Sequence, residues 1–428
     1  MPTPSSLASR SVPDSVDFST LAGVGTEQTV ALLAIAPIAT ITWAHCGPIS
    51  MQRHGRIDPR RAGLAPSGKS RDIPLGGVRW HCLCAIWPAW VGASSSSGRL
   101  AASRRATTRR YAGRLFFVPT DTLLTDEAER LGISSPDDLF GGVVPYRFVK
   151  TKAISHGLPG PRAARPPGWS DAFTAEVAPA VLPGFTAFTR GDARAAACRL
   201  LEDGAIRIKP PLAAGSRGQR VARTLDDVDE ALAVLTESDL ADCGVVLEAN
   251  LADVSTLSIG KVTVDRLTVS YVGTQAETPD NEGRHVYGGS DLTVIRGGWE
   301  ALDGLDVEPI ARQAIAPAIA YDGATVEFPG FLASRRNYDV ALGVDGRGRR
   351  RVGVLEASWR VGGASPGEII ALQELWRYPA IDSVRVSTVE RYGEGLEVPA
   401  DALVHFHAND AIAGPVLRYT RISERRPP

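Results

Sequence analysis

The pattern of apolar and polar positions is most regular late in the chain, where two β-favouring runs cover Tyr338–Val344 and Val352–Trp359. Between them lies the sequence Asp-Gly-Arg-Gly at 345–348. Gly-rich turn chemistry between two such runs is typical of a β-hairpin, because glycine adopts the backbone angles that a tight turn requires. The pattern therefore predicts a hairpin over 338–359.

The charged residues of this hairpin are expected to share one face of the sheet. Successive side chains of a strand point to opposite faces, so Glu356, Ser358 and Arg360 point the same way. A turn centred in the Gly-rich segment places Asp339 opposite Val354 and diagonal to Glu356, on that same face. Carboxylates with a nearby hydroxyl suit hard cations such as Mg²⁺, which bind oxygen ligands and bridge to phosphates. The alternative is a solvated face on which an acidic residue pairs with an arginine.

Between 186 and 248 the sequence alternates between strand and helix patterns. The predicted strands are Thr186–Phe188, Ile206–Lys209, a short strand at Val221, and Gly244–Glu248, and the predicted helices are Arg190–Glu202 and Leu225–Leu235. This alternation predicts a small α/β domain, with the glycine-containing loop 210–220 facing outward.

The chain on either side of this α/β segment shows different patterns. Upstream we expect a strand at Arg114–Val118, a helix at Thr125–Leu131 capped by Thr125, and a loop at 141–145. Downstream the pattern is rich in β-structure, with helices interspersed. The downstream elements are a hairpin of Leu257–Val264 and Leu267–Gly273, a polar loop at Thr278–Gly289, strands at Asp291–Ile295, Val384–Val389 and Leu403–His407, and helices at Ala301–Tyr321 and Ile369–Tyr378.

Length and composition set broad limits on function. The 428 residues allow two or three domains, and 44% of them are hydrophobic, which is ample for a core. The net charge of −1 predicts neither a nucleic-acid partner nor a membrane partner. The charge is uneven along the chain: thirteen basic and five acidic residues give the first 110 residues +8, and the remainder carries −9.

The first 110 residues lack a lasting helix or strand period, apart from an apolar run at Val30–Trp43. That run is too short to span a membrane and is a poor signal peptide. We expect residues 1–110 to be poorly ordered, or to be a non-native extension from a misassigned start, which an N-terminal mass measurement on the native protein would test. The five cysteines form no disulfide framework, so a reducing compartment and hence the cytoplasm are expected.

Three short motifs are weak candidates for other functions. Gly63–Ser70 matches the P-loop pattern, but its flanks lack the strand and helix that would position phosphate. The pairs at 45–46 and 81–84 contain His and Cys but lack a second half at zinc-finger spacing. His405 and His407 are expected to share a strand face, yet no carboxylate lies at a comparable spacing to complete a metal site.

Lysine is rare in this sequence, since only five of the 47 basic residues are lysine. Lys209 ends a predicted strand directly before the glycine-containing loop. Phosphate binding is well served by a compact ammonium group, so a lysine at this position, in a chain that otherwise uses arginine, indicates a phosphate site. The alternative is that Lys209 is an ordinary cation at the end of a strand.

Six short motifs follow one another along the chain. They are Lys150 or Lys152, Lys209 in Arg-Ile-Lys-Pro, the loop Gly215–Gln219, the segment Glu248–Leu251, Asp339, and Glu356-Ala-Ser358-Trp-Arg360. In this order, from about 150 to 365, the chain resembles the ATP-grasp superfamily. Residues 111–420 resemble more closely an uncharacterised bacterial family of unknown function related to that fold.

The resemblance implies an α/β (α+β) fold with a small α/β lid subdomain and a larger mixed or antiparallel sheet subdomain with helices. The implied boundaries are 1–110 for the extension, 111–185 for a partial segment before the lid, 186–250 for the lid, and 251–425 for the larger subdomain. The domain that normally precedes the lid is only partly visible, so the substrate is not identified.

The resemblance also implies a role for each matching residue. The implied ATP-binding residues are Lys150, Lys152, Lys209, Gly215, Arg217, Gly218, Gln219, Glu248, Ala249, Asn250, Leu251 and Asp253. Among them the lysines hold phosphates, backbone N–H groups of the glycine loop cover the phosphates, the 248–251 hinge receives adenine, and Asp253 is a candidate for ribose.

The resemblance places the metal site, and part of the catalytic site, at the hairpin of residues 338–359. Asp339, Glu356 and Ser358 would bind one or two Mg²⁺ ions, although Ser358 stands where the family usually has Asn. The residues implied in catalysis are Arg360 and Lys209, because cations stabilise the charge that develops as a phosphoryl group moves. Three further arginines are candidates to hold an acidic substrate: Arg296, Arg335 and Arg336.

The implied activity is that of an ATP- and Mg²⁺-dependent ligase, in which a carboxylate becomes an acyl phosphate that an amine or thiol attacks. The expected partner is a small-molecule carboxylate, and neither a nucleic acid nor a membrane is expected. The resemblance is compatible with a homodimer. Two alternatives remain open: a non-catalytic nucleotide-binding module of the same fold, and a P-loop NTPase that uses Lys69.

Overall fold

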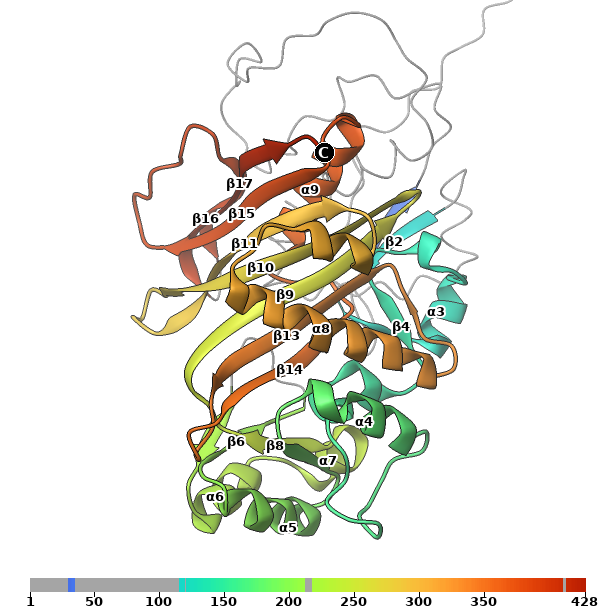
Figure 1. Cartoon of the computed structure of the whole chain (residues 1–428), viewed down its shortest axis with the longest axis vertical. Coiled ribbons are helices and arrows are strands. Elements are labelled where there is room, and N and C mark those ends of the chain that lie inside the picture. Colours follow the sequence, from blue (N-terminus) through green and yellow to red (C-terminus); the bar gives the residue numbers. More distant parts are fainter. Residues whose placement is uncertain (1–29, 35–114, 120, 212–217, 411–412) are drawn as a thin grey trace, which may run out of the picture.

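The structure is a computed structural model that describes residues 30–34, 115–119, 121–211, 218–410 and 413–428. It contains a small α/β subdomain and a larger antiparallel sheet with helices on its faces, which follow one another along the chain in that order (Figure 1). The predicted α/β fold class, with a small lid subdomain and a larger sheet subdomain, is confirmed. The zinc-like pairs and the P-loop motif lie outside the described residues.

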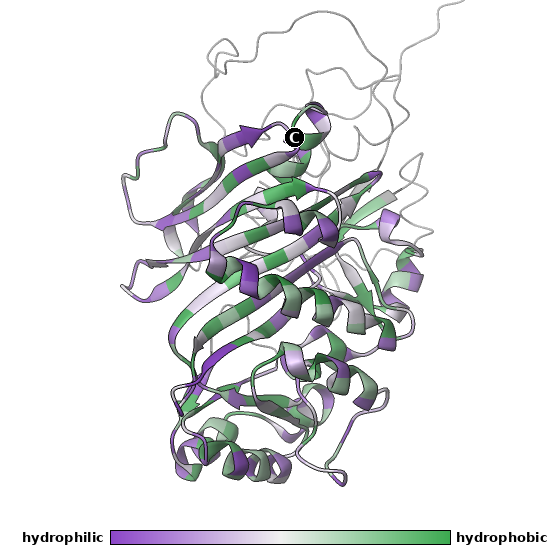
Figure 2. Cartoon of the chain, in the orientation of Figure 1, coloured by the Kyte–Doolittle hydropathy of each residue, from purple (hydrophilic) through white to green (hydrophobic). Residues whose placement is uncertain are grey.

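The larger subdomain is built on an eight-stranded sheet in which every neighbouring pair is antiparallel. Its strand order is β14-β13-β9-β10-β11-β15-β17-β16. The strands are β9 (Ala252–Val264), β10 (Leu267–Pro279), β11 (His285–Arg296), β13 (Arg335–Val344), β14 (Arg350–Ser358), β15 (Ser383–Tyr392), β16 (Leu403–Asp410) and β17 (Gly414–Arg426). Apolar residues recur along the central strands (Figure 2), and they line both faces of the sheet.

Two helices cover opposite faces of this sheet. Helix α8 (Pro309–Ala324) packs on β13, β14 and β9, and its apolar residues join those of one sheet face in a single core cluster. Helix α9 (Ser365–Arg377) packs mainly on β11 and β15, against a second core cluster. Ile259 belongs to the first cluster and Val262 to the second, as expected for residues that point to opposite faces of β9.

The small subdomain has a four-stranded antiparallel sheet in the order β5-β8-β6-β7. Its strands are β5 (Gly184–Ala187), β6 (Ile206–Lys209), β7 (Arg220–Ala222) and β8 (Val245–Ala249), and its helices are α5 (Arg190–Leu201), α6 (Leu225–Ala233) and α7 (Glu237–Cys243). The sequence pattern predicted all of these except α7, which is one short helix of mostly polar residues.

The chain before the small subdomain forms short elements. They are β2 (Leu115–Pro119), β3 (Leu123–Leu124), α3 (Thr125–Leu131), β4 (Gly142–Val144), the 3₁₀ helices η5 (Pro136–Asp138), η6 (Arg147–Lys150), η7 (Lys152–Ser155) and η8 (Ala178–Ala180), and α4 (Asp171–Val177). Strand β1 (Val30–Ala34) pairs with β2, so part of the predicted extension takes part in the fold.

Several predicted boundaries are wrong for reasons of tertiary structure. The loop expected at 141–145 contains β4, because its backbone pairs with β3 and with β12 (Leu332–Ala333). Thr125 is the first residue of α3 rather than its cap. The loop expected at Thr278–Gly289 is shorter, because β10 and β11 extend their pairing to Pro279 and His285.

The remaining corrections lie near the C-terminus. The helix expected at Ala301–Tyr321 divides into η9 (Trp299–Gly304) and α8, followed by η10 (Thr325–Glu327). The last strand, β17, was not predicted. It pairs with both β15 and β16, and such non-local pairing leaves only a weak local signal.

A glycine on β9 makes room for a tyrosine that reaches the candidate site. Gly260 pairs with Tyr271 of β10, and a Cβ atom added at Gly260 would lie 2.1 Å from the Tyr271 ring. Any larger residue at 260 must displace this fully buried ring. In contrast, a Cβ at Gly323, an exposed position in α8, would meet nothing within 4 Å.

The same substitution at these two glycines should have opposite effects on stability. We expect Gly260→Ala to lower the free energy of unfolding by about 1–3 kcal/mol through overpacking. The control Gly323→Ala should be neutral or raise it by up to about 1 kcal/mol, since alanine favours a helix interior. Denaturant unfolding of both variants measures the difference; equal effects would contradict the close contact between Gly260 and Tyr271.

Candidate functional site

The hairpin of β13 and β14 forms as predicted, but its register differs from the expected one. A bulge between Asp339 and Val340 places Asp339 directly opposite Glu356, whereas Val354 lies opposite Val340. The expectation that Asp339 faces Val354 is therefore wrong, because a bulge adds one residue to one strand and shifts every later pair. The shift brings the two carboxylates closer than the diagonal arrangement would.

Asp339 lies in a polar site on the face of the sheet opposite α8. Its Oδ1 atom accepts hydrogen bonds from Ser258 Oγ at 3.0 Å and Gln275 Nε2 at 2.9 Å, and it lies 3.1 Å from the side-chain amide of Asn337. Among the described residues, Oδ2 has no hydrogen-bond partner. Burial and the facing carboxylate of Glu356 raise the pKa of Asp339 to about 6.

The structure distinguishes the two lysines that precede the lid. Lys152 is buried, and its Nζ lies 2.5 Å from Glu356 Oε2. Lys150 instead pairs with Asp121 at 2.9 Å and donates to the carbonyl of Thr122. Lys152 is therefore the lysine that reaches the acidic hairpin.

Lys209 is fully buried at the end of β6 and lies between two elements of the site. Its Nζ lies 2.5 Å from Glu248 Oε1 and donates to the carbonyl oxygen of Leu355, the residue before Glu356. The other carboxylate oxygen of Glu248 lies 3.2 Å from His156 Nε2. Burial raises the pKa of Glu248, but the ammonium of Lys209 and the contact with His156 outweigh it, and the net pKa is lowered.

The predicted hinge, residues 248–251, begins at the glutamate of this buried pair and continues along the chain. Ala249 ends β8, and its N–H donates to the carbonyl of Pro183. Asn250 accepts a hydrogen bond from Arg207 of β6 at 2.9 Å, and Leu251 is buried. Asp253 is exposed and has a left-handed backbone conformation, with φ of 50°.

The glycine loop is only partly described. Gly215 and Arg217 lie outside the described residues. Gly218 has a φ of 70°, a conformation that favours glycine, and Gln219 lies within hydrogen-bond reach of Arg207. The predicted roles of these residues stay predictions.

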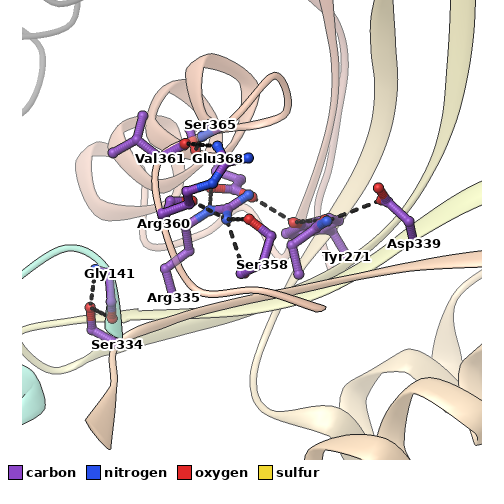
Figure 3. Close-up of polar contacts among 12 residues, drawn as sticks. Gly141, Tyr271, Ser334, Arg335, Asp339, Ser358, Arg360, Val361, Ser365 and Glu368 are labelled. Carbon is purple, nitrogen blue, oxygen red and sulfur yellow. Dashed lines mark hydrogen bonds and ion pairs between the residues drawn. The ribbon is translucent and has the colours of Figure 1, made fainter. Parts of the chain in front are cut away.

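A buried ion pair fixes the far end of the hairpin. Arg335 donates to both carboxylate oxygens of Glu368 in α9, at 2.7 and 2.8 Å, and Tyr271 donates to Glu368 Oε1 at 2.5 Å. Arg335 Nη1 also donates to the carbonyl oxygens of Ser358 and Arg360 (Figure 3). The pair therefore ties β13 to α9 and to the segment that follows β14.

The three arginines predicted to hold a substrate make contacts within the protein. Arg335 is fully buried in its pair with Glu368, and Arg336 pairs at 2.9 Å with Asp322 of helix α8. Arg296 donates to the carbonyls of Leu375 and Ile381 and lies at the end of β11, away from Asp339. The sequence could not show these partners, and the substrate-binding role expected for the three arginines stays a prediction.

Arg360 lies after the end of β14, half-buried, and its side chain donates to the carbonyl of Val361. Its role in catalysis stays a prediction. The residues that sequence reasoning missed are Asn337, Tyr271, Glu368, Gln275 and His156. Four of them reach the site from elements distant in sequence, and only Asn337, two residues before Asp339 on the same strand, had a local signal.

The described part of the chain contains no group of three or more His, Cys, Asp or Glu side chains placed to hold a metal ion. His405 contacts Thr420 Oγ1 at 2.6 Å, and the pairing of β16 with β17 shifts its register at this residue. No described helix is both long and apolar enough to cross a membrane.

A family model matches residues 96–420, and its description is protein of unknown function (DUF3182). The chain belongs to this family. The resemblance of residues 111–420 to an uncharacterised family is thus confirmed at the level of the family. A search of curated proteins finds no match for this DUF3182 member.

Three solved structures illustrate what the DUF3182 chain is similar to. An N5-carboxyaminoimidazole ribonucleotide synthetase in its ADP complex is 14% identical with a TM-score of 0.37, covering 59% of this chain and 65% of its own. An ATP complex of carboxyaminoimidazole ribonucleotide synthase from Aspergillus clavatus is 13% identical with a TM-score of 0.41, covering 78% and 85%. The phosphoribosylamine–glycine ligase of Thermotoga maritima is 15% identical with a TM-score of 0.42, covering 76% and 81%.

The chain thus spans slightly less than two thirds of the length of the first of these structures. Because all three TM-scores lie below 0.5, the function of this chain is inferred from its own residues and their contacts.

The buried charges at Glu248 give a pH-dependent prediction. Replacing Glu248 by Gln leaves Lys209 and His156 without a carboxylate, so we expect a loss of about 3 kcal/mol in unfolding free energy at pH 7. The pKa of Glu248 is lowered in the folded state, so its contribution is complete above the unfolded value of about 4.3 and is lost as the pH falls through the lower folded value. Denaturant unfolding of both proteins between pH 7 and pH 3 measures this. A difference that is constant over this range would contradict the assignment.

Proposed function

We propose that this protein is an ATP- and Mg²⁺-dependent ligase that activates a carboxylate as an acyl phosphate for attack by an amine or thiol. The observation that carries the proposal is the convergence of two lysines and two carboxylates around β14. Lys152 contacts Glu356, Lys209 contacts the carbonyl of Leu355, and Asp339 faces Glu356.

The two facing carboxylates fit Mg²⁺. This ion binds oxygen ligands and is commonly held by one or two carboxylates together with substrate phosphates. Burial raises the pKa of Asp339 most, and the facing carboxylate of Glu356 raises it further. A divalent cation between them would remove that repulsion, and Asp339 Oδ2 makes no hydrogen bond within the described residues.

The lysines fit phosphate groups beside this metal. Each ammonium is held by a glutamate, Lys209 by Glu248 and Lys152 by Glu356. A cation bound by Glu356 would weaken its attraction for Lys152 and release that ammonium for a phosphate oxygen. Binding of metal and nucleotide would then be mutually favourable, as linkage requires.

The proposed chemistry is transfer of the γ-phosphoryl group to a substrate carboxylate. One carboxylate oxygen forms a bond to phosphorus while the bond to the β-phosphate oxygen breaks, which releases ADP. The lone pair of an amine or thiol then attacks the acyl carbon, inorganic phosphate leaves as the bond from the acyl carbon to the phosphate oxygen breaks, and the nucleophile releases its proton to solvent. The lysines and Arg360 would stabilise the charge on the phosphoryl oxygens during the first step.

A second candidate is a nucleotide-binding module of the same fold without turnover. The observation in its favour is Ser358, whose Oγ lies 3.4 Å from the guanidinium of Arg335, a poor neighbour for a metal ion. ATP binding without ADP release across a panel of carboxylates and amines would support this candidate. A cytoplasmic location and a small carboxylate partner belong to the proposal as well.

Calorimetric titration of ATP into the full-length protein with Mg²⁺ tests the nucleotide site. Lys209→Ala should weaken ATP binding by at least about tenfold, because a charged hydrogen bond to phosphate contributes about 1.5–3 kcal/mol. The matched control is Lys69→Ala, which should bind ATP like the wild type. Loss of binding in Lys69→Ala alone would instead support the P-loop NTPase. Thermal unfolding checks that each variant is folded during the titration.

The metal site gives a different expectation for Glu356→Gln. We expect the factor by which Mg²⁺ tightens ATP binding to fall about tenfold in this variant, since one carboxylate ligand is lost. ATP affinity measured in EDTA should not decrease, because the substitution removes a negative charge beside Lys152. An unchanged response to Mg²⁺ would end the assignment of Glu356 as a ligand.

A further inference from the structure

The two oxygens of the Asp339 carboxylate have different surroundings. Oδ1 accepts hydrogen bonds from three donors: Ser258 Oγ at 3.0 Å, Gln275 Nε2 at 2.9 Å and Asn337 Nδ2 at 3.1 Å. Ser258 lies directly across from Asp339 on β9, Asn337 precedes it by two residues on β13, and Gln275 reaches it from β10. Oδ2 has no hydrogen-bond partner in the part of the chain that the structure describes. One oxygen is therefore held from three strands, and the other is open to a ligand.

A count of protons shows that all three groups can donate to Oδ1 at the same time. A carboxylate oxygen only accepts hydrogen bonds, so both side-chain amides turn their nitrogen towards it. The amide nitrogen of Gln275 has two protons, and it directs the second one to Ser258 Oγ at 2.8 Å. The Ser258 hydroxyl accepts this hydrogen bond and keeps its own proton for Asp339. Gln275 therefore acts on Asp339 twice, directly and through Ser258.

The donors on Asp339 are neutral, unlike the partner of the facing carboxylate. Glu356 Oε2 is held by the ammonium of Lys152 at 2.5 Å, and a cation bound by Glu356 would repel that ammonium. A hydroxyl and two amides carry no net charge, so a bound cation does not repel them in this way. Oδ1 thus stays occupied when a cation binds, and Asp339 can offer only Oδ2.

We propose that Ser258 and Gln275 are positioning residues that restrict Asp339 to a single ligand oxygen and thereby select Mg²⁺ over Ca²⁺. Mg²⁺ requires a near-ideal octahedral shell, whereas Ca²⁺ takes about six to eight oxygens and often binds both oxygens of one carboxylate. To bind Asp339 through both oxygens, Ca²⁺ must displace the donors on Oδ1. The inference rests on the proposed function and deepens it, since it states which cation the same site accepts and which residues decide this.

The test measures how Mg²⁺ and Ca²⁺ displace Mn²⁺ from the full-length protein without nucleotide, by the electron paramagnetic resonance signal of the released Mn²⁺. We expect Mg²⁺ to displace Mn²⁺ from the wild type at a concentration at least about tenfold lower than Ca²⁺ does. In the double variant Ser258→Ala/Gln275→Ala, this preference for Mg²⁺ should fall at least about tenfold. The reason is that Oδ1 becomes available to Ca²⁺, while Oδ2 loses the contacts that fix its direction.

Two further variants keep this test decisive. Gln275 is exposed, so Gln275→Ala is expected to fold even if the double variant does not, as circular dichroism will show. We expect Gln275→Ala alone to lower the preference for Mg²⁺ several-fold, because it removes one donor from Asp339 and the contact that orients Ser258. The matched control is Thr274→Ala, the exposed neighbour on β10 whose side chain points to the other face of the sheet. It should keep the cation preference of the wild type.

The ratio of the two competing cations separates this inference from the proposed function. If the wild type binds Mn²⁺ but does not prefer Mg²⁺ over Ca²⁺, the inference is overturned and the proposed metal site stands. If folded Gln275→Ala binds all three cations more weakly with an unchanged ratio, or binds them like the wild type, the selective role of Gln275 and Ser258 is overturned. If the wild type binds no Mn²⁺, the metal site of the proposed function is overturned together with the inference.

Discussion

The buried ion pair between Arg335 and Glu368 fixes much of the candidate site. Both side chains are almost completely buried, so neither charge is tolerable without the other. Their contact holds helix α9 against β13, and the same guanidinium holds the backbone after β14 through two carbonyl oxygens. Glu368 also accepts a hydrogen bond from Tyr271, whose hydroxyl contacts the side-chain amide of Asn337.

Beyond the Arg335–Glu368 pair, the polar residues of the site lie along the hairpin as pairs that face each other across β13 and β14. Asn337 faces Ser358, and after it Asp339 faces Glu356, where the bulge ends the regular register. Lysines approach from the preceding segment and from the lid strand, so positive charge meets the carboxylates at the junction of two subdomains. Opposite charges in a half-buried setting interact more strongly than they do in water. A lysine held by a glutamate in such a setting can therefore bind a phosphate strongly when the phosphate replaces the glutamate as its partner.

Most of the elements follow from local sequence patterns, and so do the chemistry-bearing residues of the hairpin. The strand that carries Lys209 has the predicted bounds, and the turn between β9 and β10 lies where expected. The site is harder to predict because its polar residues act in pairs that the chain brings together from distant segments. Arg335 and Glu368 are 33 residues apart, and His156 and Glu248 are 92 apart. Because the sequence does not reveal these partners, it cannot distinguish an arginine buried in an ion pair from one that is free to bind a substrate.

The sequence by itself determined the alternation of strands and helices, the hairpin with its carboxylates, and the order of lysine, loop and acidic motifs, because these depend on neighbouring residues. Only the tertiary structure decided the register at Asp339, the choice of Lys152 over Lys150, and the structural contacts of the three arginines. A bulge depends on the pairing of two strands, and the state of a buried charge depends on which opposite charge lies within about 4 Å. Both are set by contacts between segments that are distant in the sequence.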